Sequence, residues 1–322
     1  MNAVHRDHGA KPRLGDKLQR LLPKLALSPT FLAALFFLYG FILWTFWLSM
    51  TRSTLLPNNV FVGLAQYRYL FGNGVWWTSL INLGIYGSLY IGLSMAIGLF
   101  LAILLDQRVR AEGLFRAIYL YPMALSLIVT GVAWKWMLNP GLGIQQLMRD
   151  LGFTHFTFDW LINPQMAIYT LVIAAVWQSS GFVMALFLAG LRSIDDAVIK
   201  AAMIDGASLP RIYWSVIIPS LRPTFFSALI LLTGLSIKSF DLIMAMTGGG
   251  PGFATYLPAN FMYDFAFQRG QIAMGAASAV MMLAAVAVLI GPIVFLESRW
   301  KCAGCPCRHA RSARLPARPH CR

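Results

Sequence analysis

The segment from Lys200 to Pro223, KAAMIDGASLPRIYWSVIIPSLRP, lies between two apolar blocks that are each long enough to cross a bilayer. Residues 198–204, which overlap the start of this segment, form an apolar patch with helical spacing and charged flanks. Gly206 predicts the end of that helix, because glycine adopts backbone angles that other residues avoid. Pro223 suits the start of the next helix, where a missing amide hydrogen costs little. The segment therefore predicts a short helix at the membrane surface, followed by a new span.

The composition is that of a polytopic membrane protein. Of 322 residues, 58% are hydrophobic and only 12% are charged, and the mean hydropathy is +0.65. One soluble core would not bury so much apolar surface. About 20 mostly apolar residues span about 30 Å of hydrocarbon, and blocks of that size predict an all-α protein with six transmembrane helices. The blocks cover residues 29–50, 80–105, 117–138, 166–191, 224–246 and 271–296.

The positions of Lys and Arg predict which side of the membrane each connection occupies. Twenty of the 26 Lys and Arg residues lie before the first span, in alternate connections or after the last span, and the remaining connections hold four. By the positive-inside rule, both termini and the connection at about 192–222 are cytoplasmic. The formal net charge of +14 is then mainly a topology signal, and nucleic-acid binding is the weaker interpretation. Residues 1–28 become a basic cytoplasmic segment that leads into the first transmembrane helix, residues 29–50.

Residues 297–322 form a predicted cytoplasmic tail rich in Cys and Arg. Its candidate metal ligands are Cys302, Cys305, Cys307, His309, His320 and Cys321. This spacing leaves a zinc site open as an alternative, but the flanking residues lack the apolar periodicity that would fold around a metal. The favoured interpretation is a disordered basic tail in a reducing cytoplasm. We therefore expect no metal site.

The connections between the spans are too short to hold a catalytic domain. Residues 51–78 and 139–165 each read as a short amphipathic helix with turns. The sequence contains no G-x-x-x-x-G-K-[ST], the loop that cradles nucleotide phosphates, and no surface cluster of His, Asp or Ser that resembles a catalytic site. We expect a protein that is not an enzyme and has no cofactor. If ATP is used, another polypeptide binds and hydrolyses it.

Spacing within the opening segment resembles a known pattern. Three residues separate Ala202 from Gly206, and nine separate Gly206 from Val216. This arrangement, with Ala201 before it and Pro219 after it, resembles the EAA loop of ABC-importer permeases, E-A-A-x3-G-x9-I-x-L-P. Amphipathicity alone leaves an ordinary loop on lipid headgroups as the alternative.

Two further stretches carry the same resemblance. TGGGPGFAT, residues 247–255, is followed by MYDFAF and is similar to the segment after the fifth span of maltose-permease-type sugar importers. RAIYLYPMALSLIVTGVAWKWMLNPGLG, residues 116–143, is similar to the third span of that family and the turn after it. The matches together cover residues 77–296. The resemblance implies the type I ABC importer transmembrane fold, with five helices in that range.

By that resemblance, the loop contains a helix that docks in a cleft of a cytoplasmic ATPase subunit. The implied coupling residues are Ala201, Ala202, Met203, Ile204, Asp205, Gly206, Ala207 and Pro219. Small side chains would allow close approach, and Met203 and Ile204 would supply apolar contact. Lys200 departs from the pattern, because it occupies the usual glutamate position. Any salt bridge that the glutamate makes in relatives is therefore absent or reversed here.

A transported sugar needs hydrogen-bonding groups and aromatic rings inside the membrane. The spans offer Asn82, Tyr86, Trp134, Trp136, Trp177, Gln178, Ser179, Lys238, Phe240 and Asp241, and Gly249 and Gly250 predict a tight turn beside the pathway. Aromatic residues of this kind also serve as lipid-facing anchors. Lys238 and Asp241, three apart, are expected on one helix face, where they can neutralise each other. Their alternative role is to fix helix packing.

The predicted function is that of one permease subunit of an ATP-driven sugar importer in a bacterial inner membrane. The implied partners are a second homologous permease, two cytoplasmic ATPase subunits, a periplasmic or lipid-anchored sugar-binding protein, and membrane lipid. The stretch WKWMLNPGLGIQ favours a monosaccharide such as glucose or mannose. One alternative is a secondary transporter driven by an ion gradient, with Lys238 and Asp241 as its ion site. The other is an ABC importer for a non-sugar solute such as glycerol phosphate or a polyamine.

Overall fold

The computed structural model describes residues 14–303, apart from 56, 57, 59, 108 and 109. These residues form helices and turns, with one isolated β-bridge between Thr51 and Phe61. The longer helices are α1 (Leu14–Ser49), α3 (Gly74–Asp106), α4 (Glu112–Ala124), α5 (Leu127–Met137), α7 (Ala167–Arg192), α11 (Arg222–Ile237) and α14 (Ile272–Ala303). The shorter ones are α2 (Ala65–Gly72), α6 (Ile144–Asp150), α8 (Asp196–Ile204), α9 (Leu209–Ile212), α10 (Ile218–Ser220), α12 (Phe240–Met246) and α13 (Pro258–Tyr263). A 3₁₀ turn, η2 (Pro251–Phe253), and two π segments, η1 (Tyr213–Ile217) and η3 (Asp264–Gln268), complete the order.

The number of spans agrees with the prediction. Four helical stretches are long and apolar enough to cross a membrane, namely Ser28–Ser49, Gly74–Asp106, Ala167–Arg192 and Ile272–Phe295. Two bent helix pairs bring the total within the described residues to six if each pair is one span. The first helix starts earlier than predicted, because α1 is already helical at Leu14. The cysteine-rich stretch 304–322 and residues 1–13 lie outside the described residues.

The third span is broken, and our prediction of one continuous helix at 117–138 was wrong. Helices α4 and α5 meet at an angle of 98°. Pro122 lies in the last turn of α4, and Leu125 and Ser126 after it are extended. Proline provides no amide hydrogen and disfavours continuation of the helix. The Ser126 side chain accepts from the Ile128 amide and so starts α5.

The fifth span is bent at its start and interrupted near its end. Helix α11 bends by 62° from the segment Pro210–Ser220 at its start, and at its other end it stops at Ile237. Lys238 and Ser239 separate it from α12. The predicted span at 224–246 is therefore two helices, α11 and α12, separated by two residues, and the 62° bend lies just before it. Pro223 lies in the first turn of α11, as the sequence predicts.

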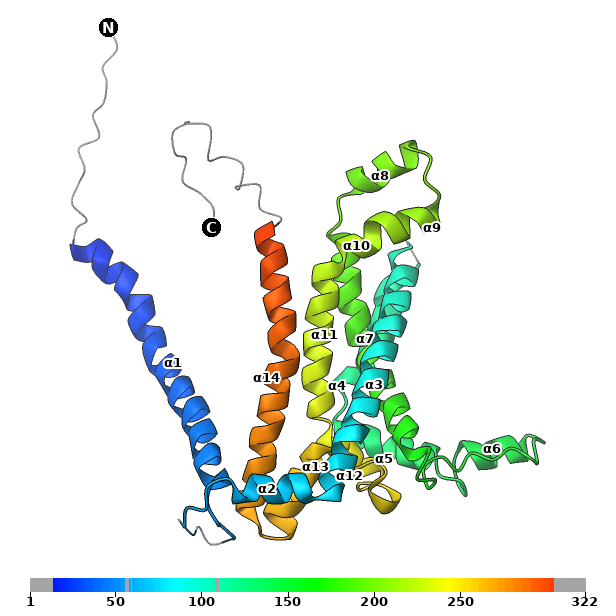
Figure 1. The fold of residues 1–322 in the computed structure, drawn as a ribbon. Coiled ribbons are helices and arrows are strands. Elements are labelled where there is room, and N and C mark those ends of the chain that lie inside the picture. The colour runs from blue at the N-terminus through cyan, green and yellow to red at the C-terminus, as the bar shows by residue number, and fades with distance from the viewer. Residues whose placement is uncertain (1–13, 56–57, 59, 108–109, 304–322) are drawn as a thin grey trace.

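Figure 1 shows how these elements are arranged. Helices α3, α7 and α11 run side by side, with α7 packed against α3, α4 and α11. Helix α14 lies beside them, and α1 contacts α14 but diverges from it toward the start of α1. Helices α8 and α9 lie at one end of the bundle, here called the α8 end, together with the start of α1 and the end of α14. The opposite end, called the α2 end, carries α2, α6, α12 and α13.

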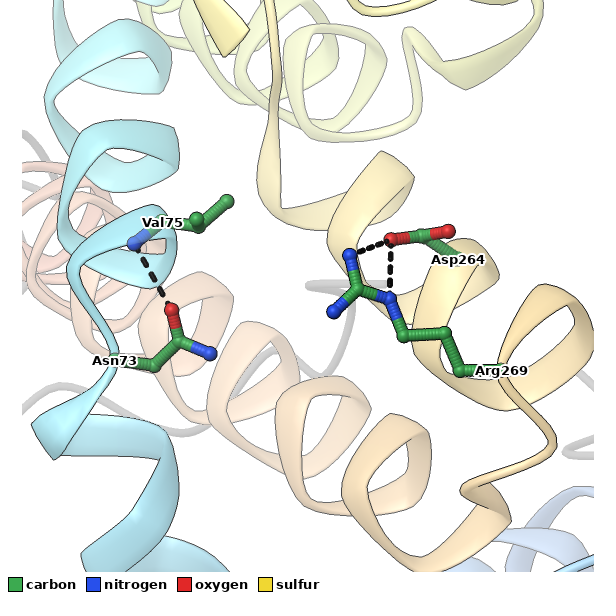
Figure 2. A network of polar contacts seen from close by, with 4 residues as sticks. All are labelled: Asn73, Val75, Asp264 and Arg269. Atoms are coloured by element: carbon green, nitrogen blue, oxygen red, sulfur yellow. Dashed lines mark hydrogen bonds and ion pairs between the residues drawn. The ribbon is translucent and has the colours of Figure 1, made fainter.

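The α2 end is held by local polar contacts, which Figure 2 shows. The Asn73 side chain accepts from the Val75 amide at 3.0 Å and starts α3. Arg269 donates twice to one oxygen of Asp264, at 2.8 and 3.0 Å, and its guanidinium lies 4.3 Å from the centre of the Phe265 ring. Burial, together with the negative charge of Asp264, raises the pKa of the Tyr256 phenol above its usual value.

Candidate functional site

A cavity of about 310 Å³ lies where the broken helices meet α3 and α7. It is lined by Tyr86, Tyr90, Met123, Leu125, Leu127, Ala175, Gln178, Ser179, Leu235, Ser239 and Leu242. These residues come from α3, from the α4–α5 break, from α7, and from the α11–α12 break. The described residues bring only uncharged polar groups to it, namely hydroxyls and one amide. We call this space the central cavity.

Two tyrosines form one wall of the central cavity. The rings of Tyr86 and Tyr90, one helical turn apart on α3, are parallel within 1° with centroids 5.7 Å apart. The Tyr86 hydroxyl donates to Ser239 Oγ at 2.9 Å. The Tyr90 hydroxyl and Ser179 Oγ are 2.7 Å apart and share one hydrogen bond. Helix α3 is therefore tied to the α11–α12 break by one tyrosine and to α7 by the other.

Gln178 links α7 to the other break. Its Nε2 donates to the carbonyl oxygen of Leu125 at 3.0 Å. Its Oε1 is buried and has no hydrogen-bond partner among the described residues. Gln178 lies about 17 Å from the start of α7, at 1.5 Å per residue, and so near the middle of that span. A buried, unpaired acceptor is therefore present deep in the membrane region.

The structure brings together some of the predicted pathway residues. Tyr86, Gln178 and Ser179 line the central cavity, whereas Trp177 does not. Trp177 is 41% exposed and meets Trp134 edge to face, at 5.9 Å between ring centroids. Trp136 is 71% exposed. None of the three rings lines the central cavity, and Trp134 is half-buried and packs against the core of the bundle.

Other candidates shape the turn at the α2 end. Nδ2 of Asn82 donates to the carbonyl oxygens of Phe253 and Tyr256, both at 3.0 Å. Gly249 and Gly250 have φ of +104° and +77°, which confirms the predicted tight turn. Asn82 thus fixes the turn instead of reaching the cavity. Phe240 packs on Tyr263, with centroids 4.9 Å apart.

The expectation for Lys238 and Asp241 was wrong. They do not share a helix, because Lys238 ends α11 and Asp241 belongs to α12. Both side chains are exposed, and the described part of the chain contains no ion pair between them. The i, i+3 argument assumed a continuous helix, and the helix stops at Ile237. Sequence reasoning also missed Tyr90 and Ser239. The four-residue spacing from Tyr86 would have indicated Tyr90, because residues four apart share a helix face.

The loop at the α8 end has the predicted form. Helix α8 starts at Asp195, whose carboxylate accepts from the Ala197 amide at 2.9 Å. It ends at Asp205 and Gly206, where φ is +78°. The Ala207 amide returns to the carbonyl of Ala202 at 3.1 Å and closes the turn.

The two faces of α8 differ. Ile199 and Ala202 pack against the core of the bundle, and Ala207 follows them. Ile204 is 86% exposed, and Val198, Lys200, Ala201 and Met203 are exposed as well. Ala202 is therefore a contact to the bundle, whereas the exposed side chains are free to meet another molecule. Pro219, in α10, borders a shallow groove with Arg222 and Phe225.

Comparison with known proteins identifies the family. Residues 94–301 match the family described as binding-protein-dependent transport system inner membrane component. The chain belongs to this family of ABC importer permeases. The permease is accordingly an integral inner-membrane component of a transport system and not itself catalytic.

Named relatives include sugar and glycerol-phosphate permeases. The permease is 34% identical to the trehalose/maltose transport system permease protein MalF of Thermococcus litoralis, over 85% of this chain and 92% of that protein. It is 40% identical to the xylose/arabinose import permease protein XacH of Haloferax volcanii, over 63% of this chain and 64% of that protein. The sn-glycerol-3-phosphate transport system permease protein UgpA of Agrobacterium fabrum is 30% identical, with 87% and 96% covered.

The fold matches a solved structure of a bacterial ABC transporter involved in the import of the acidic polysaccharide alginate. The TM-score is 0.76, with 89% of the permease and 99% of that chain covered, at 18% identity. This agreement confirms the type I importer fold predicted for the permease. Membership of the family also sets aside the ion-gradient transporter as an alternative.

Proposed function

We propose that this chain forms the translocation pathway of an ATP-driven sugar importer, and that its solute is a monosaccharide such as glucose or mannose. The observation that carries the proposal is the central cavity, whose polar lining consists of hydroxyls and one amide beside two parallel tyrosine rings. A sugar offers many hydroxyls and apolar ring faces, and these groups match such a lining. The volume of about 310 Å³ lies at the lower end of the roughly 300–1,000 Å³ that ligand pockets occupy, which favours a small solute.

A second, homologous permease completes the pathway. Lys238 and Asp241 are exposed beside the α11–α12 break, and a charged side chain facing the middle of a bilayer costs about 3 kcal/mol. Leu231 and Leu235 are exposed on the same helix, and Leu235 also borders the central cavity. We assign this face to the second permease and the aqueous path between the two subunits. Lipid would not compensate the two charges.

The α8 end faces the cytoplasm in this proposal, as do both termini. The excess of Lys and Arg on that side supports the orientation. Two ATPase subunits lie below, and α8 docks in a cleft of one of them through Ala201, Met203 and Ile204. A periplasmic or lipid-anchored sugar-binding protein delivers the solute to the α2 end. ATP-driven closure moves α8, and the bundle alternates between two accessible states.

One observation favours a second solute class. Lys238 directly precedes Ser239 of the central cavity, and UgpA, a relative, is named for sn-glycerol 3-phosphate. A cation beside the cavity would suit a phosphate group. Glycerol phosphate is therefore the alternative solute, and a polyamine is the less favoured one, because it would repel Lys238.

The test is uptake by the whole complex. The permease is reconstituted in proteoliposomes with the second permease, ATPase and binding protein encoded in its genome neighbourhood. Labelled glucose, mannose, xylose, trehalose and glycerol 3-phosphate are offered with ATP inside the vesicles. We expect uptake of a monosaccharide that stops when the ATPase carries a substitution that abolishes hydrolysis. Uptake of glycerol 3-phosphate alone would overturn the sugar proposal. Sugar uptake without any ATPase, under an ion gradient, would overturn ATP coupling.

A further inference from the structure

We infer that Gln178 helps to determine solute specificity. Its unpaired Oε1 accepts a hydrogen bond from one hydroxyl of the solute, while its Nε2 donates to the Leu125 carbonyl at the α4–α5 break. This inference rests on the proposed function, because it names how the central cavity recognises its solute.

The break itself requires the donor that Gln178 supplies. Where α4 stops, Leu125 is extended, and its carbonyl oxygen receives Nε2 at 3.0 Å. Inside a membrane no bulk water replaces such a bond. This contact also fixes the orientation of the amide, because the NH₂ group must point to the carbonyl. Oε1 is thereby directed away from Leu125.

Oε1 is left without a donor. Gln178 is 7% exposed, and no described residue donates to this buried oxygen. Buried polar groups are nearly always satisfied, so each exception calls for a partner that the chain does not supply. The side chain lines the central cavity, which has room for such a partner.

The neighbouring hydroxyls define what that partner must be. Tyr86 donates to Ser239, and Ser239 donates to the carbonyl of Leu235 at 3.0 Å, so both of their hydrogens are used. Tyr90 and Ser179 share one bond and have one hydroxyl hydrogen left. One unpaired acceptor and one spare donor thus lie on residues that line the cavity. A hydroxyl group is both donor and acceptor and satisfies both.

This complement favours a hydroxyl over an ionised phosphate group as the partner of Oε1. An ionised phosphate oxygen carries no hydrogen and would meet Oε1 acceptor to acceptor. A solute hydroxyl that donates to Oε1 also polarises the amide and strengthens the bond from Nε2 to Leu125. Occupancy of the cavity is thereby communicated to the α4–α5 break.

The experiment uses analogues that each lack one hydroxyl. Uptake by the reconstituted complex is measured with D-glucose and its monodeoxy analogues, or with the corresponding series for the sugar that the uptake screen returns. Wild type is compared with Gln178→Met, which keeps the length and removes both hydrogen-bonding groups. The matched control is Ser180→Ala on the same helix, because Ser180 is buried outside the cavity and bonds only to the Trp177 carbonyl.

We expect Gln178→Met to raise the KM for the parent sugar roughly 5-fold, because the variant loses one neutral hydrogen bond to the solute. One deoxy analogue should show no such rise, because it lacks the hydroxyl that Gln178 reads. The same binding protein is used in all measurements. A change in the ratio of the KM for an analogue to the KM for the parent sugar, between wild type and variant, is therefore caused by the permease. Ser180→Ala should match wild type with every sugar.

Equal losses for the parent and all analogues would overturn the inference, since they would mean that Gln178 only holds the helix break. An unchanged KM would overturn it as well. If Gln178→Met does not accumulate in the membrane, Gln178→Asn replaces it, because its amide is one methylene shorter and misses the solute. If the wild-type complex imports no sugar, both the proposed function and the inference are overturned. If it imports sugar but Gln178→Met leaves the KM unchanged, only the inference is overturned.

Discussion

Helices α7 and α1 are equally apolar but occupy opposite environments. The mean hydropathy is 1.9 for Ala167–Arg192 and 2.0 for Ser28–Ser49. In α7, however, 67% of the apolar stretch is buried in the bundle, against 0% in α1. Hydropathy therefore shows that both helices belong in the membrane, and says nothing about which one lies at its centre.

Side-chain size separates them. Helix α7 has Ala174, Ala175 and Gly181 on its buried faces, whereas α1 presents large aromatic side chains outward. Lipid tails are as apolar as the protein, so helices associate in membranes by close packing, and small residues permit it. The difference teaches that small residues let neighbouring helices approach α7 closely, although α7 also buries large side chains such as Phe187.

The largest effect is expected where this close packing is tightest. At Gly181, α7 contacts the backbone carbonyl of Tyr119 on α4, and any Cβ would run into it. Gly181→Leu should prevent α4 from packing on α7 and abolish assembly, because overpacking against backbone costs more than the usual 1–3 kcal/mol. Gly40 on α1 has open space around it, so Gly40→Leu is the control. Size-exclusion chromatography in detergent measures both; equal profiles would refute the packing argument.

A smaller loss is expected from a cavity in the same helix. Phe187 is fully buried, and its ring lies 4.7 Å from that of Phe225 on α11. Phe187→Ala should destabilise the permease by about 2 kcal/mol. This value is the cost of the cavity left by the ring; the second part of the usual cost, moving an apolar side chain out of water, is small in a membrane because lipid is also apolar. Phe36 on α1 is 74% exposed, and Phe36→Ala should be silent. Thermal unfolding followed by tryptophan fluorescence would test both, and a loss of stability at Phe36 would argue that α1 is covered by protein.

The sequence predicted what depends on local chemistry. A span needs about 20 apolar residues, so the six membrane crossings could be counted. The end of α8 at Gly206 could be predicted because glycine adopts backbone angles that other residues avoid. The position of Pro223 in the first turn of α11 could be predicted because proline lacks an amide hydrogen. Tyr86 and Ser179 could be named because polar groups inside a span are expensive.

The α4–α5 break has a local signal in Pro122 and Ser126, but the contact that compensates it joins distant residues and could not be predicted in the same way. The α4–α5 discontinuity is compensated by Gln178, which is 53 residues beyond Leu125. Apolar residues continue across the α4–α5 break, so hydropathy gives no signal there, whereas Lys238, Ser239 and Asp241 are polar residues at the α11–α12 break. Lys238 and Asp241 were placed on one face because an i, i+3 spacing was taken to lie within one helix. Residues from both breaks line the central cavity.

A third prediction contrasts two reasons for glycine. Gly181 is required by space, whereas Gly206 has nothing within 4 Å but a φ of +78°. Gly206→Val should strain the turn after α8 by about 1–2 kcal/mol and lower the uptake obtained per ATP hydrolysed. Gly206→Asn should retain coupling, because asparagine tolerates this conformation. If both variants uncouple, bulk on the docking face, and not backbone strain, limits the turn.

The smallest effect is expected at the exposed ends of the same α4–α7 pair that Gly181 holds together. Arg192 and Glu112 form an ion pair of 2.7 Å at the α8 end, with both side chains partly exposed. Water and salt screen such a pair, and ordering two long side chains offsets most of the attraction. Glu112→Gln should therefore leave thermal stability nearly unchanged. Asp264→Asn is the comparison at the α2 end and should be more damaging, because Arg269 also makes two contacts to Asp264 and lies over Phe265. A clear loss of thermal stability in Glu112→Gln would show that the ion pair contributes substantially to holding α4 against α7.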